Sequence, residues 1–182
     1  QYLVSPADSL ARIPTGVDFA EASTLPMNGL TAVQTLEKLD LQPGQSLAVT
    51  GAAGTLGNYL VQLAKHSGLV VVADAAAKDR DLVSSLGPDY VVDRGNDFAD
   101  HVRELFPDGV DALADAAVMN GKAVSAVRND GGFATFRWWS QEPGRGITVH
   151  PIAVREEYHS ARKLETLRQL VEDGTLTLRV AD

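Results

Sequence analysis

The sequence predicts a doubly wound α/β fold, in which a six-stranded parallel sheet carries helices on both faces. Short apolar segments such as Leu69–Ala73 (LVVVA) are typical of strands that are buried on both faces. These segments alternate with helical patterns of about 10–15 residues, and that order favours parallel strands. Six such strands match a complete doubly wound sheet.

The elements follow from breaker residues and from hydrophobic periodicity, taken in chain order. Residues 1–26 contain three Pro residues, the last of them Pro26, and Gly16, and predict an irregular lead-in with a short strand and a short helix capped by Asp18. Helices are expected at 28–39, 55–66, 78–86, 97–106, 121–128 and 158–172. Strands are expected at 46–50, 69–73, 90–93, 110–114, 132–136 and 147–154.

Composition limits the classes of partner. The chain has 182 residues and a net charge of −8, so we expect neither nucleic acid nor a membrane surface as its partner. It has no cysteine, which excludes disulfides and Cys-based zinc sites in this chain. No signal sequence or membrane-length apolar run is present, so we expect a cytoplasmic location. Both ends lack a start Met or a polar tail, and we expect a piece of a longer polypeptide.

A glycine-rich turn lies between the strand expected at 46–50 and the helix expected at 55–66. Its pattern is G-x-x-G-x-x-G. Glycine permits close backbone approach, and a helix N-terminus presents unpaired N–H groups to an anion. We therefore expect this turn to hold the diphosphate of a dinucleotide; the alternative is a corner that serves only helix–strand packing. The candidate residues are Gly51, Ala52, Ala53, Gly54, Thr55, Leu56 and Gly57.

Charged residues near the expected second and third strands bear on the choice of cofactor. Asp74 lies at the end of the second strand, where a carboxylate can bind the ribose 2′-hydroxyl of NAD(H). Lys78, Arg80 and Arg94 could instead clamp the 2′-phosphate of NADP(H). The two sets of residues favour opposite cofactors, and each cation could equally be a solvated surface residue.

Several segments resemble the medium-chain dehydrogenase/reductase superfamily, in its quinone-oxidoreductase-like branch. GAAGTLGNYLVQLAK (51–65) resembles the signature G-A-A-G-x-x-G-x-x-x-x-Q-x-A-K, and further segments are similar to family motifs. Those segments are LPMNGLTAVQTL (25–36), LVSSLGPDYVVD (82–93), VDALADAA (110–117), GGFATF (131–136) and GITVHPIAV (146–154). The resemblance implies a Rossmann dinucleotide-binding domain at 26–182, with 1–25 a remnant of the join to a catalytic domain outside this chain.

The resemblance also implies a function. Such proteins transfer hydride from NAD(P)H to an activated C=C or C=O bond of a small molecule, such as a quinone or an enone. The branch favours NADP(H), and it places Asp115, Ala116 and Phe136 beside the nicotinamide. It implies a homodimer formed through the edge strand 147–154. Because half of the cleft would lie outside this chain, we expect residues 1–182 alone to turn over little.

Three features depart from the family pattern or from its zinc-dependent members. Met27 occupies the place of a catalytic zinc-binding cysteine, and a thioether is a poor zinc ligand, so we expect no zinc. Val118 stands where a glycine is common near the nicotinamide, which puts the fit of that loop in question. The adjacent Trp138 and Trp139 replace a small turn; we expect one to pack and one to be exposed, or both to meet the absent domain.

Two other functions remain open from the sequence. The first is an enoyl-reductase module of a polyketide or fatty-acid synthase. The second is a nucleotide-binding module without turnover, which Val118 keeps under consideration. No catalytic residue is assigned, because the His residues and Tyr59 are isolated in the sequence.

Overall fold

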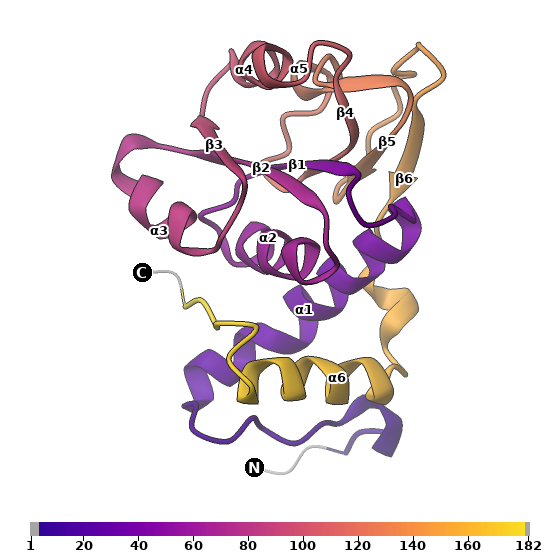
Figure 1. The fold of residues 1–182 in the computed structure, drawn as a ribbon. Coiled ribbons are helices and arrows are strands. Elements are labelled where there is room, and N and C mark those ends of the chain that lie inside the picture. Colours follow the sequence, from indigo (N-terminus) through magenta and orange to yellow (C-terminus); the bar gives the residue numbers. More distant parts are fainter. Residues whose placement is uncertain (1–3, 181–182) are drawn as a thin grey trace.

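A computed structural model describes residues 4–180 and contains one six-stranded sheet with all strands parallel (Figure 1). The strands are β1 (Ser46–Thr50), β2 (Val70–Ala75), β3 (Tyr90–Asp93), β4 (Val110–Asp115), β5 (Val127–Thr135) and β6 (Thr148–Pro151). Their order across the sheet is β3-β2-β1-β4-β5-β6. The predicted doubly wound parallel sheet is therefore confirmed. Of the two expected segments, the first (1–25) has residues 1–3 outside the described residues, and the second (26–182) has residues 181–182 outside them.

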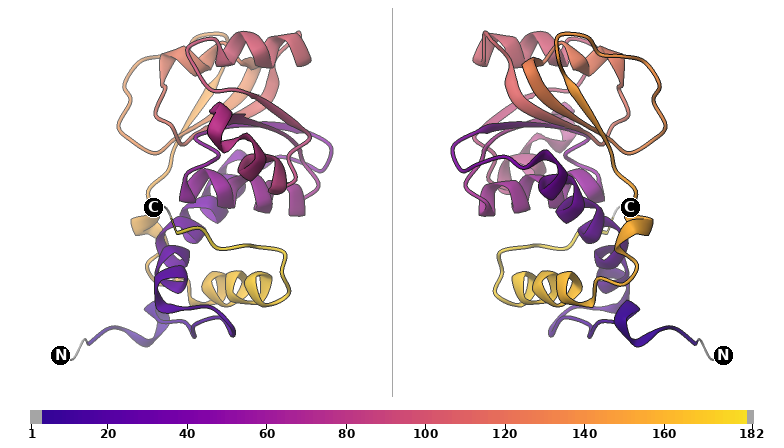
Figure 2. Two further views of the ribbon diagram at one scale, coloured as in Figure 1. Left: turned by 90° about the vertical axis from the view of Figure 1, so that its left-hand side faces the viewer. Right: turned by 90° about the vertical axis from the view of Figure 1, so that its right-hand side faces the viewer.

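Helices cover both faces of this sheet (Figure 2). They are α1 (Phe19–Leu39), α2 (Thr55–His66), α3 (Arg80–Ser85), α4 (Phe98–Leu105), α5 (Gly121–Val124) and α6 (Ala161–Glu172), with 3₁₀ segments η1 (Ala7–Ser9), η2 (Ala77–Asp79) and η3 (Val154–Glu157). Helices α1, α2 and α3 pack in the core on one face, and α4 and α5 pack in the core on the other. Helix α6 packs against α1.

Strand β1 shows why the sequence pattern is continuous rather than alternating. Leu47 and Val49 belong to the core shared with α1 and α2, whereas Ala48 between them belongs to the core shared with α4. All five residues of β1 are buried as a result. A strand covered on both faces needs apolar side chains on both sides, as at Leu47, Ala48 and Val49. The buried hydroxyls of Ser46 and Thr50 at its two ends instead bond to Asp111 and Asp115.

The expected break at Pro26 is wrong, because α1 runs through this residue. The helix begins with a capping box, in which Asp18 accepts from the Glu21 N–H at 2.8 Å and Glu21 accepts from the Asp18 N–H at 2.9 Å. Pro26 removes one helical hydrogen bond, but tertiary packing on both sides of it maintains the helix. Gly29 lies so close to Leu167 of α6 that an added Cβ would be 2.9 Å from Leu167 Cδ1. The division of the chain at residue 25 stays a prediction.

The helix expected at 121–128 is also wrong over its second half. Helix α5 ends at Val124, and β5 begins at Val127, five residues before the strand expected at 132–136. Arg103 of α4 stabilises the early start, since its guanidinium donates to the carbonyls of Ser125 and Val127 at 2.7 and 3.0 Å. The last strand is shorter than the expected range 147–154, because only Thr148–Pro151 pair with β5.

Strands β1 and β4 are neighbours, although two strands separate them in the sequence. The strand order therefore reverses between them. Open α/β sheets bind ligands at the carboxyl ends of the strands at such a reversal. The turn after β1 and the loop after β4 meet at this point.

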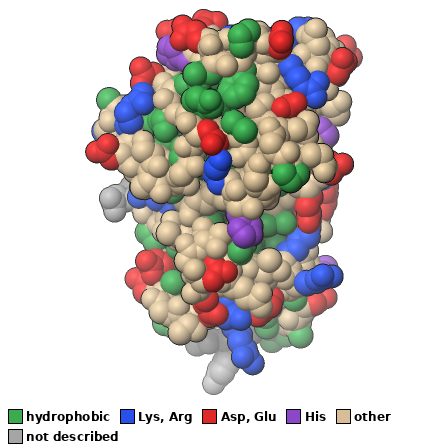
Figure 3. Space-filling model, in the orientation of Figure 1, with side chains coloured by type: hydrophobic (Ala, Val, Ile, Leu, Met, Phe, Trp, Pro, Cys, Tyr) green, Lys and Arg blue, Asp and Glu red, His purple; other side chains and the backbone are tan. Residues whose placement is uncertain are grey.

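Charged side chains of both signs are interspersed over the face shown in Figure 3, and blue Lys and Arg side chains form no continuous stripe on that face. None of the helices within residues 4–180 combines the length and the hydrophobicity of a bilayer-spanning segment.

We expect Gly57→Ala to destabilise the chain by about 1–3 kcal/mol, the usual range for an overpacked core position. A Cβ at Gly57 would lie 2.2 Å from the carbonyl oxygen of Gly51 and 2.6 Å from its carbon, both backbone atoms. Gly95→Ala is the control, because a Cβ added at Gly95 would have no atom within 4 Å, and this variant should change stability by less than about 0.5 kcal/mol. Urea unfolding measures both; equal stability of the two variants would contradict the packing.

Candidate functional site

The three glycines of the turn after β1 have different structural roles. Gly51 has φ +70°, and a Cβ there would lie 3.0 Å from the Ala117 nitrogen, so conformation and space both require glycine. Gly57 is required by packing against Gly51. Gly54 has φ −80° and is exposed, and the only atom within 4 Å of an added Cβ is the Gly51 oxygen at 3.3 Å. The fold therefore does not account for Gly54 as it does for the other two.

The start of α2 presents free amide groups beside Gly54. The Gly54 N–H donates to the Gly51 carbonyl at 2.9 Å, and the first bond of the helix runs from Asn58 N–H to the Gly54 carbonyl at 2.8 Å. The N–H groups between them, of Thr55, Leu56 and Gly57, belong to the first turn and have no intrahelical acceptor. Together with the positive end of the helix dipole they suit a phosphate group.

Asp74 of β2 lies under this turn rather than at the surface. Its side chain is 1% exposed, and its Oδ1 accepts a hydrogen bond from the Ala52 N–H at 2.9 Å. Its Oδ2 is buried and has no hydrogen-bond partner among the described residues. Burial raises the pKa of this carboxyl above its ordinary value, although the Ala52 N–H and Arg94 act in the opposite direction. Asp74 therefore supports the turn from inside the sheet.

Asp115 at the end of β4 holds the neighbouring loop. Its Oδ1 accepts from the Thr50 hydroxyl at 2.7 Å and from the Met119 N–H at 2.9 Å, and its Oδ2 accepts from the Asn120 N–H at 2.6 Å. The Thr50 hydroxyl oxygen in turn accepts from the Ala117 N–H at 3.0 Å. The loop after β4 is thus fixed against the end of β1 and against Gly51.

That loop carries two residues in unfavourable backbone conformations. Val118 has φ +57°, which is rare for a β-branched residue, and Asn120 has φ +53° with ψ −128°. A glycine at position 118 would adopt this φ without strain. Backbone strain of this kind persists only where the surrounding structure holds it, and strained residues cluster at ligand sites.

The three cations predicted as a clamp do not form one cluster. The Arg80 guanidinium donates to the Val91 carbonyl at 3.1 Å and to Asp93 Oδ1 at 2.5 Å. Both acceptors belong to β3, so this guanidinium is already engaged within the fold. Lys78 is exposed on η2. Arg94 is 51% exposed, and its Nε lies 3.9 Å from Asp74 Oδ2.

Arg94 instead shares a cavity of about 420 Å³ with a cation that the sequence did not single out, Lys122 of α5. Asn96, Val118 and Met119 also line it. Lys122 Nζ donates to Asn96 Oδ1 at 3.1 Å, which joins the loops after β3 and β4. Nothing in the sequence marked Lys122, because its position depends on how the two loops fold together.

Two further candidates lie at the carboxyl ends of their strands. Ala116 follows β4, and a Cβ on Gly51 would approach its carbonyl carbon at 3.2 Å. Phe136 follows β5 and lines a hollow of about 410 Å³ with both tryptophans. Trp139 packs on Phe133 with ring centroids 5.1 Å apart, whereas Trp138 is 93% exposed. The expectation that one tryptophan packs and one is exposed is confirmed.

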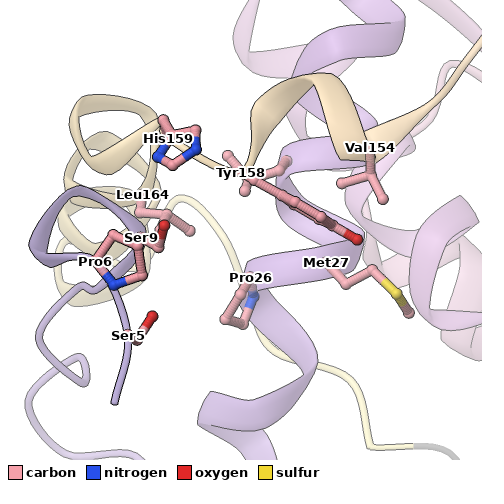
Figure 4. Close-up of a pocket in the computed structure, with 10 residues that line it drawn as sticks. Ser5, Pro6, Ser9, Pro26, Met27, Val154, Tyr158, His159 and Leu164 are labelled. Atoms are coloured by element: carbon pink, nitrogen blue, oxygen red, sulfur yellow. The ribbon is translucent and has the colours of Figure 1, made fainter.

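A separate apolar cavity of about 560 Å³ lies between the N-terminal segment, α1, η3 and α6 (Figure 4). Met27 and Tyr158 line it, and Met27 is 62% exposed. His159 at its edge pairs with Asp8, with 3.0 Å between Nδ1 and Oδ1. Within residues 4–180 no group of three or more His, Cys, Asp or Glu side chains could hold a metal ion.

The residues after the glycines in the signature also have a structural role. Gln62 Nε2 donates to the Thr177 carbonyl at 3.2 Å, and its Oε1 accepts from the Thr177 N–H at 2.8 Å. Lys65 Nζ donates to the Leu69 carbonyl at 3.1 Å and to Asp89 Oδ2 at 2.7 Å. The first pair fixes the segment after α6 along α2, and the second fixes the start of β2.

Comparison with known proteins identifies the family. The family model described as zinc-binding dehydrogenase matches residues 55–158, more than half of the chain. The chain belongs to this family of the medium-chain dehydrogenase/reductase superfamily. The predicted superfamily is thereby confirmed.

Individual relatives agree with this assignment. An NADPH-dependent alkenal/one oxidoreductase of Arabidopsis thaliana is 34% identical over 133 residues, which are 72% of this chain and 33% of the relative. A 2-methylene-furan-3-one reductase of Solanum lycopersicum is 32% identical over 151 residues, 82% of this chain and 38% of the relative. A mycobacterial protein solved with NADPH shares the fold, with a TM-score of 0.84 and 24% identity, over 97% of this chain and 60% of that one. The chain spans about a third of the length of the first curated relative and 38% of the second.

We expect Asp74→Asn to become more stable relative to the wild type as pH rises. The raised pKa of Asp74 means that the folded chain holds this proton more tightly than the unfolded chain. The stability that the carboxyl contributes is complete below its ordinary pKa of 3.8 and is lost as pH rises through the raised value. The amide has no such proton. Urea unfolding of both proteins across this pH window would show a growing difference, and a constant difference would contradict the burial.

We expect Val118→Gly to be about 1 kcal/mol more stable than Val118→Ala. Both variants remove the side chain beyond Cβ, but only glycine relieves a left-handed conformation that costs about 1–2 kcal/mol, part of which the greater entropy of unfolded glycine offsets. Thermal or urea unfolding of the two variants measures the difference. Equal stabilities would show that residue 118 does not hold φ near +57°.

Proposed function

We propose that this chain is the cofactor-binding part of an NADP(H)-dependent oxidoreductase, and that the diphosphate binds at Gly54. The exposed Gly54, which the fold itself does not require, carries this proposal. It leaves an open surface beside the free N–H groups of Thr55 and Leu56, where a side chain would obstruct a ligand. The residues present therefore suit the cofactor.

The preference for NADP(H) over NAD(H) rests on where the charges lie. The Asp74 side chain is buried beneath the turn, where its Oδ1 is bound to the Ala52 N–H, so its carboxyl does not face the surface where a ribose would lie. Arg94 and Lys122 line one cavity between the loops after β3 and β4, with Arg94 Nε 3.9 Å from Asp74 Oδ2 of β2, and together they suit a 2′-phosphate. The Arabidopsis relative, 34% identical, is described as NADPH-dependent.

The reaction proposed for the whole protein is reduction of an activated C=C or C=O bond, as in an enone or a quinone. A bound nicotinamide supplies the hydride. This chain would hold it between the loop after Asp115 and the end of β5 at Phe136, and the packed loops would exclude water there. The two curated relatives act on an alkenal or enone and on a methylene-furanone by their descriptions. The net charge of −8 accords with a small-molecule substrate rather than nucleic acid or membrane.

We propose that no zinc takes part. In the resemblance, Met27 stands at the place of a catalytic cysteine, and a thioether is not a ligand that zinc ordinarily takes. Adding a chelator to the full-length enzyme should leave its activity unchanged.

We also propose a homodimer through residues 147–154, because strand β6 in this range is at one edge of the sheet. We propose a cytoplasmic location as well.

A non-catalytic nucleotide-binding module is the second candidate, favoured by the strained Val118 in the loop near the nicotinamide. The third candidate is an enoyl-reductase module of a polyketide or fatty-acid synthase. The parent chain of such a module would carry long flanking domains, which a stand-alone oxidoreductase would not. Acceptor-dependent oxidation of NADPH by the full-length protein separates the first from the second. Cofactor binding without such oxidation would establish the module without turnover.

We expect the isolated chain to bind NADPH at least about tenfold more tightly than NADH, a difference of about 1.4 kcal/mol. Arg94→Gln should reduce this preference, because the 2′-phosphate would lose a cation. Arg162→Gln is the control, since Arg162 is an exposed residue of α6. Tryptophan fluorescence and calorimetry follow the binding. Tighter binding of NADH would refute the assignment of the 2′-phosphate.

A further inference from the structure

The segment after α6 lies along α2 and ends at the glycine turn. Leu176 is buried, and its N–H donates to the Leu170 carbonyl at 2.8 Å. Thr177 is held by both ends of the Gln62 amide, and its hydroxyl also donates to Gln62 Oε1 at 3.0 Å. Thr177 contacts Gln62, whereas the later residue Arg179 contacts Tyr59 and Thr55, so the segment runs antiparallel to α2 and toward its N-terminus. This register brings Arg179 to the turn.

Arg179 contacts the start of α2 with its backbone and its side chain. Its N–H donates to the Tyr59 hydroxyl at 3.4 Å, and its carbonyl accepts from the Thr55 hydroxyl at 3.4 Å. Its side-chain Nε donates to the carbonyl of Ala53, the residue before Gly54, at 3.3 Å. Among residues 4–180 no acceptor bonds the two Nη atoms of this guanidinium. Both Nη atoms, with their four N–H groups, therefore remain available as donors next to the exposed glycine.

The positive charge of Arg179 lies near the N-terminus of α2, where it is electrostatically unfavourable unless an anion binds beside it. Cations are disfavoured at the N-terminus of a helix, because the helix dipole is positive there. The backbone contacts of Arg179 and the Thr177–Gln62 pair already hold the segment, so the guanidinium is not needed for docking. A positive side chain beside the positive end of a helix makes a site for a strongly negative ligand.

We propose that Arg179 is a further binding residue for the cofactor, whose guanidinium contacts the diphosphate at the glycine turn. This inference rests on the function proposed above. A guanidinium presents its donors in a fork that matches two phosphate oxygens. Arg179 would thus close the site from the C-terminal segment, while the N–H groups of Thr55 and Leu56 hold the phosphates from α2. The sequence alone did not mark it, since it is more than 120 residues from the glycines.

Titration of four proteins with NADPH, NADH and inorganic pyrophosphate tests this proposal. The proteins are the wild type, Arg179→Gln, Arg179→Lys and the surface control Arg162→Gln. We expect Arg179→Gln to weaken the binding of NADPH and of NADH by the same factor, about tenfold, because both cofactors carry the diphosphate. The same substitution should also weaken the binding of inorganic pyrophosphate. Arg179→Lys should be intermediate, Arg162→Gln should match the wild type, and added salt should narrow the differences.

The alternatives give different results. Unchanged affinity of Arg179→Gln for both dinucleotides would overturn this inference and leave the proposed function standing. A loss confined to NADPH would place Arg179 at the 2′-phosphate and also overturn it. Failure of the wild type to bind either dinucleotide would refute the proposed function together with this inference. Urea unfolding of each variant shows whether a lost affinity reflects lost ligand contacts or a lost fold, and equal unfolding midpoints with weaker binding support the proposal.

Discussion

The hydrogen bonds of the buried Asp115 carboxylate organise the candidate site. Asp115 ends β4 and Thr50 ends β1, so the 2.7 Å bond between them joins the two strands where the order of the sheet reverses. The same hydroxyl and carboxylate fix the loop after β4, which passes so close to Gly51 that no side chain fits there. The positive φ of Val118 follows from this arrangement, because the loop must turn within a few residues to satisfy the carboxylate.

Much of the fold could be predicted from the sequence because the sheet is buried on both faces. The bounds expected for Ser46–Thr50 agree with the structure, and all five of its residues are buried. The bounds of the edge strand Tyr90–Asp93 also agree, because a Gly-Pro turn precedes it, although only Val92 is buried there. The errors occur where distant packing outweighs a local signal. Pro26 is a helix breaker by itself, yet packing of α1 against α6 maintains the helix. Val127 begins a strand because it pairs with Val110 of β4, and the distant Arg103 and Arg145 both bind its carbonyl.

The site could be predicted where a short motif defines it and less well where side chains converge from separate elements. The glycine turn follows from its spacing and its neighbours. The position of Asp74 near the turn follows from the sequence, but the direction of its carboxylate, toward Ala52, depends on the pleat of β2. Arg80 is engaged by Asp93, a partner that the sequence does not identify. Lys122 and Arg179 required the three-dimensional arrangement of loops and helices.

Hydrogen exchange of the chain with and without saturating NADPH tests the central claim most directly. If the diphosphate binds where β1 and β4 meet, the amides of residues 51–57 and 116–120 will exchange more slowly with NADPH present. Protection confined to the apolar cavity lined by Met27 and Tyr158 would contradict the account, because it would place the nucleotide away from the glycine turn.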